Sequence, residues 1–139
     1  MKIISRNLLI YALLLLIYSL LFRFGLSALL TAERWAWVVL ISVAYGAAIF
    51  FTAWTTGKRD GMNNFLFNAG FRWNLTTFII WGLASEAWFL LGWHSAHESI
   101  RVVHITLLIW SGFLFLHFIL FLILRRRTIK GVHKSDIFE

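Results

Sequence analysis

Four long runs of apolar residues alternate with short polar segments along the chain. Each run reaches the roughly 20 residues that a helix needs to cross a bilayer. Because hydrocarbon does not satisfy free backbone N–H and C=O groups, helices are the expected form for such runs. We therefore predict an all-α, polytopic membrane protein with four transmembrane helices in an up-down bundle. The predicted helices cover about residues 8–30, 35–54, 74–92 and 102–124.

The polar segments between these runs are too short to fold on their own. Residues 1–139 are therefore predicted to form a single four-helix membrane domain. Residues 57–61, which begin and end with glycine, are predicted to form a turn. Three arginines follow the last run, and we expect residues 125–139 to form a cytoplasmic tail.

The composition supports a membrane protein. Of the 139 residues, 60% are hydrophobic and 18% are aromatic, and the mean hydropathy is +0.79. A soluble domain of this length leaves too much of its surface in water to hide so many apolar side chains. The sequence has no cysteine, which excludes disulfides, thiolate metal ligands and thiol catalysis. It also has no proline, so we expect the helices to run unbroken.

The distribution of charge predicts an orientation. Arg23, Arg34 and Arg101 are expected on one side of the membrane, and the other ten of the 13 Lys and Arg residues on the opposite side. Cytoplasmic segments carry the excess of basic residues, so both termini are predicted in the cytoplasm (N-in, C-in) of a cell inner membrane. The net charge is +7. We expect the basic residues to bind anionic lipid headgroups of the bilayer, and we expect no nucleic-acid partner.

Polar residues inside the apolar runs are the candidate functional groups, because they are costly in lipid and usually have partners. Arg23 lies seven residues before Leu30, and Glu86 lies six residues before Gly92. At about 1.5 Å per residue, both lie roughly 10 Å below the outer boundary, so we predict an Arg23–Glu86 ion pair. Each helix offers one polar residue near this depth, and the predicted intramembrane cluster is Arg23, Ser42, Glu86 and His104. A second, inner polar level contains Asn74, Thr77 and His117.

Two interpretations of the outer cluster stay open. In the first, the cluster lines a water-accessible path for a proton or an ion in the outer half of the bilayer. In the second, it is a structural staple that fixes the order of the helices and conducts nothing. At the inner level, we expect an uncharged His117 that bonds to a threonine hydroxyl.

His104 and His117 share one predicted helix, which resembles the two-histidine helices of membrane b-type cytochromes. Their spacing of 13 residues separates them by roughly 140° around the helix, whereas 14 would bring them within about 40°. Each haem would also need a second axial ligand, and the other helices offer no central histidine. Haem is therefore an alternative rather than the expected cofactor.

His94, His97 and Glu98 are weak candidates for a metal site. On a helical turn they would share one face, and imidazole with carboxylate suits zinc. The segment joins two membrane helices and must contain a turn, so the alternative is a polar outer loop with Glu98 near Arg101. We expect no bound cofactor.

Small residues indicate where helices approach closely, because lipid already solvates large apolar side chains. Ser42 and Gly46 lie one turn apart on one face, and Gly82 lies one turn before Glu86. Four helices leave little room for a private pore, so a conducting path would run more easily between copies of the chain. We therefore expect a homo-oligomer or a subunit of a membrane complex.

These observations favour three functional classes. The first is a small oligomeric ion or proton channel or transport protein. The second is a non-conducting accessory or scaffold subunit of a membrane complex, and the third is a b-type haem or metal-binding membrane protein. The sequence shows no nucleophile with a matching base and no glycine-rich phosphate loop, so an enzyme is not expected.

Overall fold

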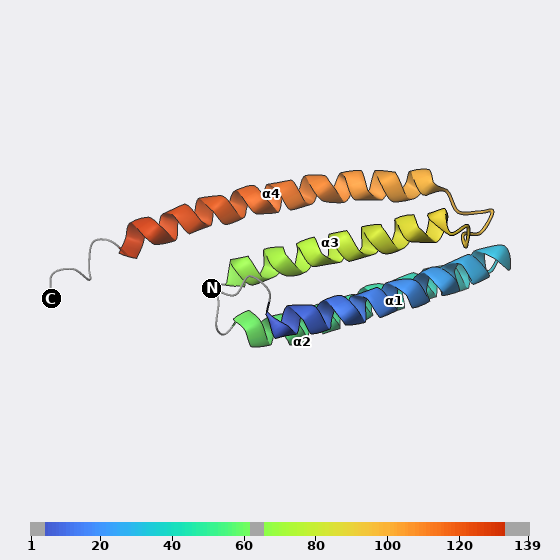
Figure 1. Ribbon diagram of the computed structural model, residues 1–139, viewed down its shortest axis with the longest axis horizontal. Coiled ribbons are helices and arrows are strands. Elements are labelled where there is room, and N and C mark those ends of the chain that lie inside the picture. The colour runs from blue at the N-terminus through green and yellow to red at the C-terminus, as the bar shows by residue number, and fades with distance from the viewer. Residues whose placement is uncertain (1–4, 62–65, 133–139) are drawn as a thin grey trace.

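The computed structural model describes residues 5–61 and 66–132 of the chain. Four helices follow one another: α1 (Arg6–Thr31), α2 (Trp35–Gly61), α3 (Leu66–Leu90) and α4 (Ile100–Val132). No strand occurs in the described ranges, so the prediction of an all-α chain with four helices is confirmed. Each helix runs antiparallel to the preceding one (Figure 1). The connections 32–34 and 91–99 therefore lie at the same end of the molecule, which we call the loop end.

Three stretches of the described chain are long and apolar enough to cross a membrane: Arg6–Thr31, Trp35–Lys58 and Ile100–Ile123. The remaining helix, α3, carries polar residues such as Asn74 and Glu86. It is also the helix that packs against all three others. Polar side chains of a membrane helix usually face protein rather than lipid, so the composition of α3 fits its central position.

Away from the loop end, three helices extend further than predicted. α2 continues through Gly61, so the predicted turn at 57–61 is wrong, and α3 begins at Leu66 rather than near residue 74. α4 continues through Val132, so the boundary between helix and tail at residue 125 is also wrong. The predicted ends followed hydrophobicity, which marks a membrane surface, whereas Lys and Arg are good helix formers and no proline stops the helices. Residues 133–139 of the predicted tail lie outside the described residues.

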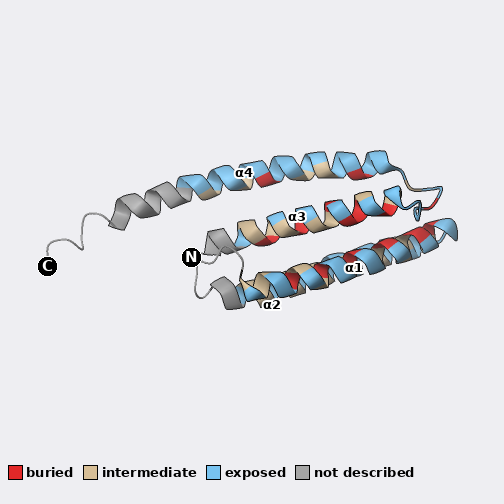
Figure 2. Ribbon diagram, viewed as in Figure 1, coloured by how far each residue is buried: buried red, intermediate tan, exposed pale blue. Residues whose placement is uncertain are grey.

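The packing is less symmetric than the predicted up-down bundle. α1, α2 and α3 share an interior, whereas α4 lies against α3 alone. Buried residues gather on α1 and α3, and α4 is exposed along most of its described length (Figure 2). The small core of Tyr11, Leu15 and Trp73 joins α1 to α3. The fold is therefore a three-helix cluster with a fourth helix on one side.

The buried face of α1 is more polar than its exposed face. Inward-facing residues recur at a spacing of four, and they are Tyr11, Leu15, Ser19, Arg23 and Ser27. Tyr11 Oη lies 2.6 Å from Thr77 Oγ1 of α3. Ser19 Oγ lies 2.7 Å from Tyr45 Oη of α2. Large apolar side chains such as Phe24 point outward, which is the arrangement expected of a helix in lipid.

Candidate functional site

An ion pair buried near the loop end forms the centre of the candidate site. Nη1 of Arg23 lies 3.4 Å from Oε2 of Glu98, and the two side chains are only 6% and 5% exposed. Arg23 also donates from Nε, at 3.2 Å, and from Nη2 to Oγ of Ser85 on α3. The guanidinium lies 5.4 Å from the ring centre of Trp81, within range of a cation–π interaction. An acid, a hydroxyl and an aromatic ring thus surround the charge of Arg23.

Glu98 accepts three hydrogen bonds. Ser27 Oγ donates to Oε1, the backbone N–H of Ser95 donates to the same oxygen at 3.0 Å, and Arg23 donates to Oε2. Trp88 Nε1 in turn donates to Ser27 Oγ at 3.0 Å. No buried side-chain nitrogen or oxygen in the described ranges lacks a hydrogen-bond partner. A buried polar network that is fully satisfied in this way fixes one geometry, whereas a partly satisfied one is costly.

The turns of the 91–99 connection bring Glu98 within reach of Arg23. α3 ends just before Gly92, which takes a φ of +71°, the left-handed conformation that glycine adopts readily. The amide of Gly92 donates back to the carbonyl of Phe89 at 3.1 Å. The chain then turns again, with the Glu98 amide donating to the Ser95 carbonyl at 3.0 Å. A hydrogen bond of 3.1 Å from Thr31 Oγ1 to Ser95 Oγ ties this connection to the end of α1.

The predicted ion pair between Arg23 and Glu86 is wrong. The ionic partner of Arg23 is Glu98, and the α3 residue that faces Arg23 is Ser85. Successive helical residues differ by about 100°, so Glu86 points in another direction. Depth along a helix predicts partners on neighbouring helices, whereas the connection that carries Glu98 folds back within reach of the long Arg23 side chain. The alternative contact between Glu98 and Arg101 is not formed in the described structure either.

Glu86 pairs instead with His104 of α4, at 2.8 Å between Oε1 and Nε2. These side chains are 35% and 57% exposed, so this pair is open where the Arg23–Glu98 pair is enclosed. Ser42 joins neither pair, because it is exposed on α2 and its hydroxyl donates to the carbonyl of Val38 at 2.8 Å. The structure therefore divides the predicted four-residue cluster among three separate places.

The residues of the predicted inner level also have separate partners. Asn74 Oδ1 accepts from Trp110 Nε1 at 3.0 Å, which links α3 to α4. Thr77 bonds to Tyr11 of α1, with 2.6 Å between the two hydroxyl oxygens. His117 lies edge-on to Phe71, with ring centres 5.7 Å apart. The expected hydrogen bond between His117 and a threonine is absent from the described structure.

The weak metal candidates at the loop end do not converge. His94 stacks on Phe89 with ring centres 4.6 Å apart, and His97 lies 3.9 Å from Glu33. Glu98 is engaged in the buried ion pair. Among the described residues, no group of three or more His, Asp or Glu side chains is arranged to hold a metal ion.

His104 and His117 have only α3 as a neighbouring helix, because α4 packs against no other helix of the described chain. α3 contains no histidine. A second axial ligand for haem at either position would therefore have to come from outside this helix pair.

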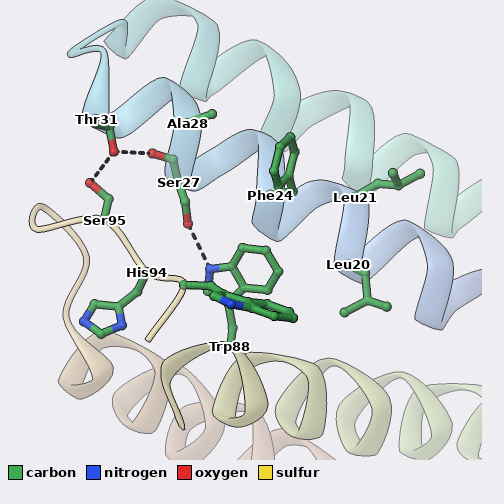
Figure 3. A pocket seen from close by; sticks show the side chains of 10 residues that line it. Leu20, Leu21, Phe24, Ser27, Ala28, Thr31, Trp88, His94 and Ser95 are labelled. Carbon is green, nitrogen blue, oxygen red and sulfur yellow. Dashed lines mark hydrogen bonds between the residues drawn. The ribbon is translucent and has the colours of Figure 1, made fainter. Parts of the chain in front are cut away.

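A pocket of about 750 Å³ borders the buried network between α1 and the end of α3. Leu20, Leu21 and Phe24 of α1 line its apolar part, with Trp88 of α3 beside them (Figure 3). The hydroxyls at its loop end belong to Ser27, Thr31 and Ser95. Its described lining includes the imidazole of His94 but no Asp, Glu, Lys or Arg side chain.

Three serines that complete the network were not predicted from the sequence: Ser27, Ser85 and Ser95. A single serine in an apolar helix carries little information, because its hydroxyl can bond to its own backbone, as Ser42 does. A signal was nevertheless present in the first helix, where Ser19, Arg23 and Ser27 recur every four residues. Polar residues at that spacing share one helical face, and that face is the buried one.

No protein-family model, curated protein or solved structure matches this chain. The site is therefore interpreted from its own chemistry. That chemistry consists of an enclosed, fully bonded ion pair on one side of α3 and an open acid–imidazole pair on another.

Proposed function

We propose that this chain is a non-conducting membrane subunit, a small scaffold in which the Arg23–Glu98 network locks α1 and α3 to the 91–99 connection. The observation that carries the proposal is the enclosure of this pair, whose side chains are 6% and 5% exposed. A path for ions or protons needs a charged group that water reaches, whereas a lock is strongest where water is excluded. The fully engaged donors and acceptors around Arg23 support the lock.

The proposal includes four helices that cross an inner membrane with both termini in the cytoplasm. Three apolar stretches support this insertion, and α3 would enter with them because it packs against all three other helices. Arg6, Lys58 and Arg72 lie on the helix segments away from the loop end, as does the three-arginine segment 125–127. Since cytoplasmic segments carry the excess of Lys and Arg, this distribution supports an external loop end.

Flux measurements in liposomes test the proposal. The purified protein is expected to pass no more H⁺, K⁺ or Cl⁻ than empty liposomes do. Glu98→Gln is expected to lower thermal stability without creating flux, because it leaves the buried charge of Arg23 without a counter-ion. A wild-type flux that Glu98→Gln abolishes in a folded protein would contradict the proposal.

Transport is the second candidate function, and the open Glu86–His104 pair is the observation that favours it. Asp, Glu and His side chains inside membrane helices form the proton relays of pumps and transporters. For a transporter, flux in liposomes would exceed that of empty liposomes, and Glu86→Gln and His104→Ala would each reduce it. Glu33→Gln is the matched control, since Glu33 is an exposed acid 3.9 Å from His97 at the same end of the molecule.

A further inference from the structure

The Glu86–His104 pair lies where contact with lipid tails alone would be unfavourable for ionisable side chains. His104 lies within the apolar stretch Ile100–Ile123, and Glu86 lies in the last turns of α3. Beyond their mutual contact of 2.8 Å, neither side chain has a hydrogen-bond or ion-pair partner among the described residues. Ionisable side chains inside membrane helices usually face protein or a water-filled cavity. The side of the molecule that carries this pair is therefore expected to meet another polar surface.

The surface around the pair is apolar and exposed. Leu83 of α3 is 66% exposed and Leu108 of α4 is 73% exposed. Leu83 precedes Glu86 by three residues and Leu108 follows His104 by four, so each leucine shares a helical face with one member of the pair. We call the surface formed by Leu83, Glu86, His104 and Leu108 the pair flank. Its residues differ from those through which the buried network contacts α3, which are Trp81, Ser85 and Trp88.

We propose that the pair flank is the contact surface for a second copy of this chain, related to the first by a twofold axis. A twofold axis brings the same patch of both copies together, so the patch has to complement itself. The pair flank does so through its hydrogen-bonding groups, because a half-turn sets the carboxylate of Glu86 in one copy against the imidazole of His104 in the other. The inference rests on the membrane-spanning part of the proposed function and is independent of whether the chain conducts.

The polar contact is what makes this surface selective. In lipid the hydrophobic effect does not drive helices together, since acyl chains solvate Leu83 and Leu108 as well as another helix does. Packing and polar contacts supply the preference for protein over lipid. Two acid–imidazole contacts across the axis would distinguish this face from the other exposed apolar faces of α2 and α4.

Energy transfer between labelled copies tests the inference. The sequence has no cysteine, so Lys58→Cys provides a single site for a donor or an acceptor dye far from the pair. In vesicles of neutral lipid, energy transfer of the wild type is expected to fall as the protein is diluted with lipid. Glu86→Gln and His104→Gln are each expected to weaken association by roughly three- to tenfold, the range of polar contacts between membrane helices. Glu33→Gln is expected to behave as the wild type.

A mixture of two variants separates a contact across the axis from a contact within one chain. Glu86→Gln copies lack the acid and His104→Gln copies lack the imidazole, so neither variant alone forms an acid–imidazole contact. Mixed together, they restore one such contact between copies and none within a copy. The mixed pair is therefore expected to associate more tightly than either variant with itself, while the thermal stability of each chain is unchanged by mixing.

Cross-linking locates the contact surface. Leu108→Cys is expected to form a disulfide between copies on oxidation, because it lies on the pair flank. Phe113→Cys is the control, since Phe113 is 65% exposed and lies about 180° from His104 around α4. A wild type that stays monomeric at every dilution, a mixture no tighter than the single variants, or a Leu108→Cys chain that cross-links only to other proteins would overturn the inference.

The two proposals fail in different ways in these vesicles. Absence of dimers together with absence of ion flux overturns the inference about the pair flank alone. Dimers that conduct ions overturn the proposed non-conducting function alone.

Discussion

Arg23 and Glu98 are each costly to bury and are stable only together. Removing one partner of a buried pair typically costs about 3–5 kcal/mol, because the other charge is left uncompensated, whereas replacing both is often close to neutral. We therefore expect Arg23→Met and Glu98→Leu each to lower the free energy of unfolding by about that amount, and the double variant to recover most of the loss. Denaturant titration in one detergent measures all three variants.

Glu33→Gln serves as the control for this cycle, because Glu33 is exposed and, among the described residues, its one ion pair is a 3.9 Å contact with His97. Its effect is expected to stay within about 0.5 kcal/mol, as is usual at surface positions. If the double variant loses as much as the sum of the two single variants, the buried pair is not an energetic unit.

At this scale the sequence identified the right kinds of residue but not their partners. Arg23, Glu86 and His104 were all singled out, and two of them are in contact with each other. The partner of Arg23 was predicted incorrectly. Counting residues from a helix end gives the depth of a residue in the membrane but not the direction in which its side chain points around the helix axis. The position of Glu98 depends on the turn at Gly92 and on the hydrogen bonds that follow it. This connection is irregular, so no periodicity in the sequence predicts its geometry.

At the scale of helices, the missing side chain of Gly25 on α1 leaves room for the Ile41 side chain of α2. A Cβ added at Gly25 would lie 2.5 Å from Cδ1 of Ile41, whereas one added at Gly46 would meet nothing within 4 Å. Overpacking typically costs about 1–3 kcal/mol, so Gly25→Leu is expected to lower the free energy of unfolding by that amount and Gly46→Leu to leave it nearly unchanged. Ile41→Ala added to Gly25→Leu is expected to restore part of the loss. Equal melting temperatures for the two glycine variants would show that α1 and α2 do not pack closely at Gly25.

The sequence predicts the number of helices and their ends near the loop end. Both follow from the lengths of the apolar runs and from the polar residues that flank them. The predicted starts at residues 35 and 102 lie close to the observed starts at Trp35 and Ile100. Of the two glycines predicted to lie at close helix–helix contacts, only one does. A Cβ at Gly82 would lie 3.1 Å from Cδ2 of Leu107, which confirms tight packing there, but Gly46 faces open space. A small residue permits contact without requiring it.

At the scale of the whole molecule, the position of α4 could not be predicted. Lipid and protein interior are both apolar, so a membrane helix that is apolar all round does not reveal which face it buries. The polar contacts that do define faces, such as that between Trp110 and Asn74, involve side chains too widely spaced to form a pattern. Hydropathy therefore predicted a bundle, whereas the structure leaves α4 on one side of α3 with most of its surface exposed.

The distribution of Lys and Arg predicts the orientation of the molecule in the membrane. Single cysteines at exposed positions test this orientation without disturbing the fold. Ala96 is exposed in the 91–99 connection, and Lys58 is exposed on α2 away from the loop end. Because most Lys and Arg residues lie away from the loop end, we expect an impermeant maleimide to label Ala96→Cys in intact cells and to label Lys58→Cys only after permeabilisation. The chain has no cysteine of its own, so each label reports a single site. Labelling of Lys58→Cys from outside, with Ala96→Cys protected, would reverse the orientation and place the buried Arg23–Glu98 pair near the cytoplasmic surface.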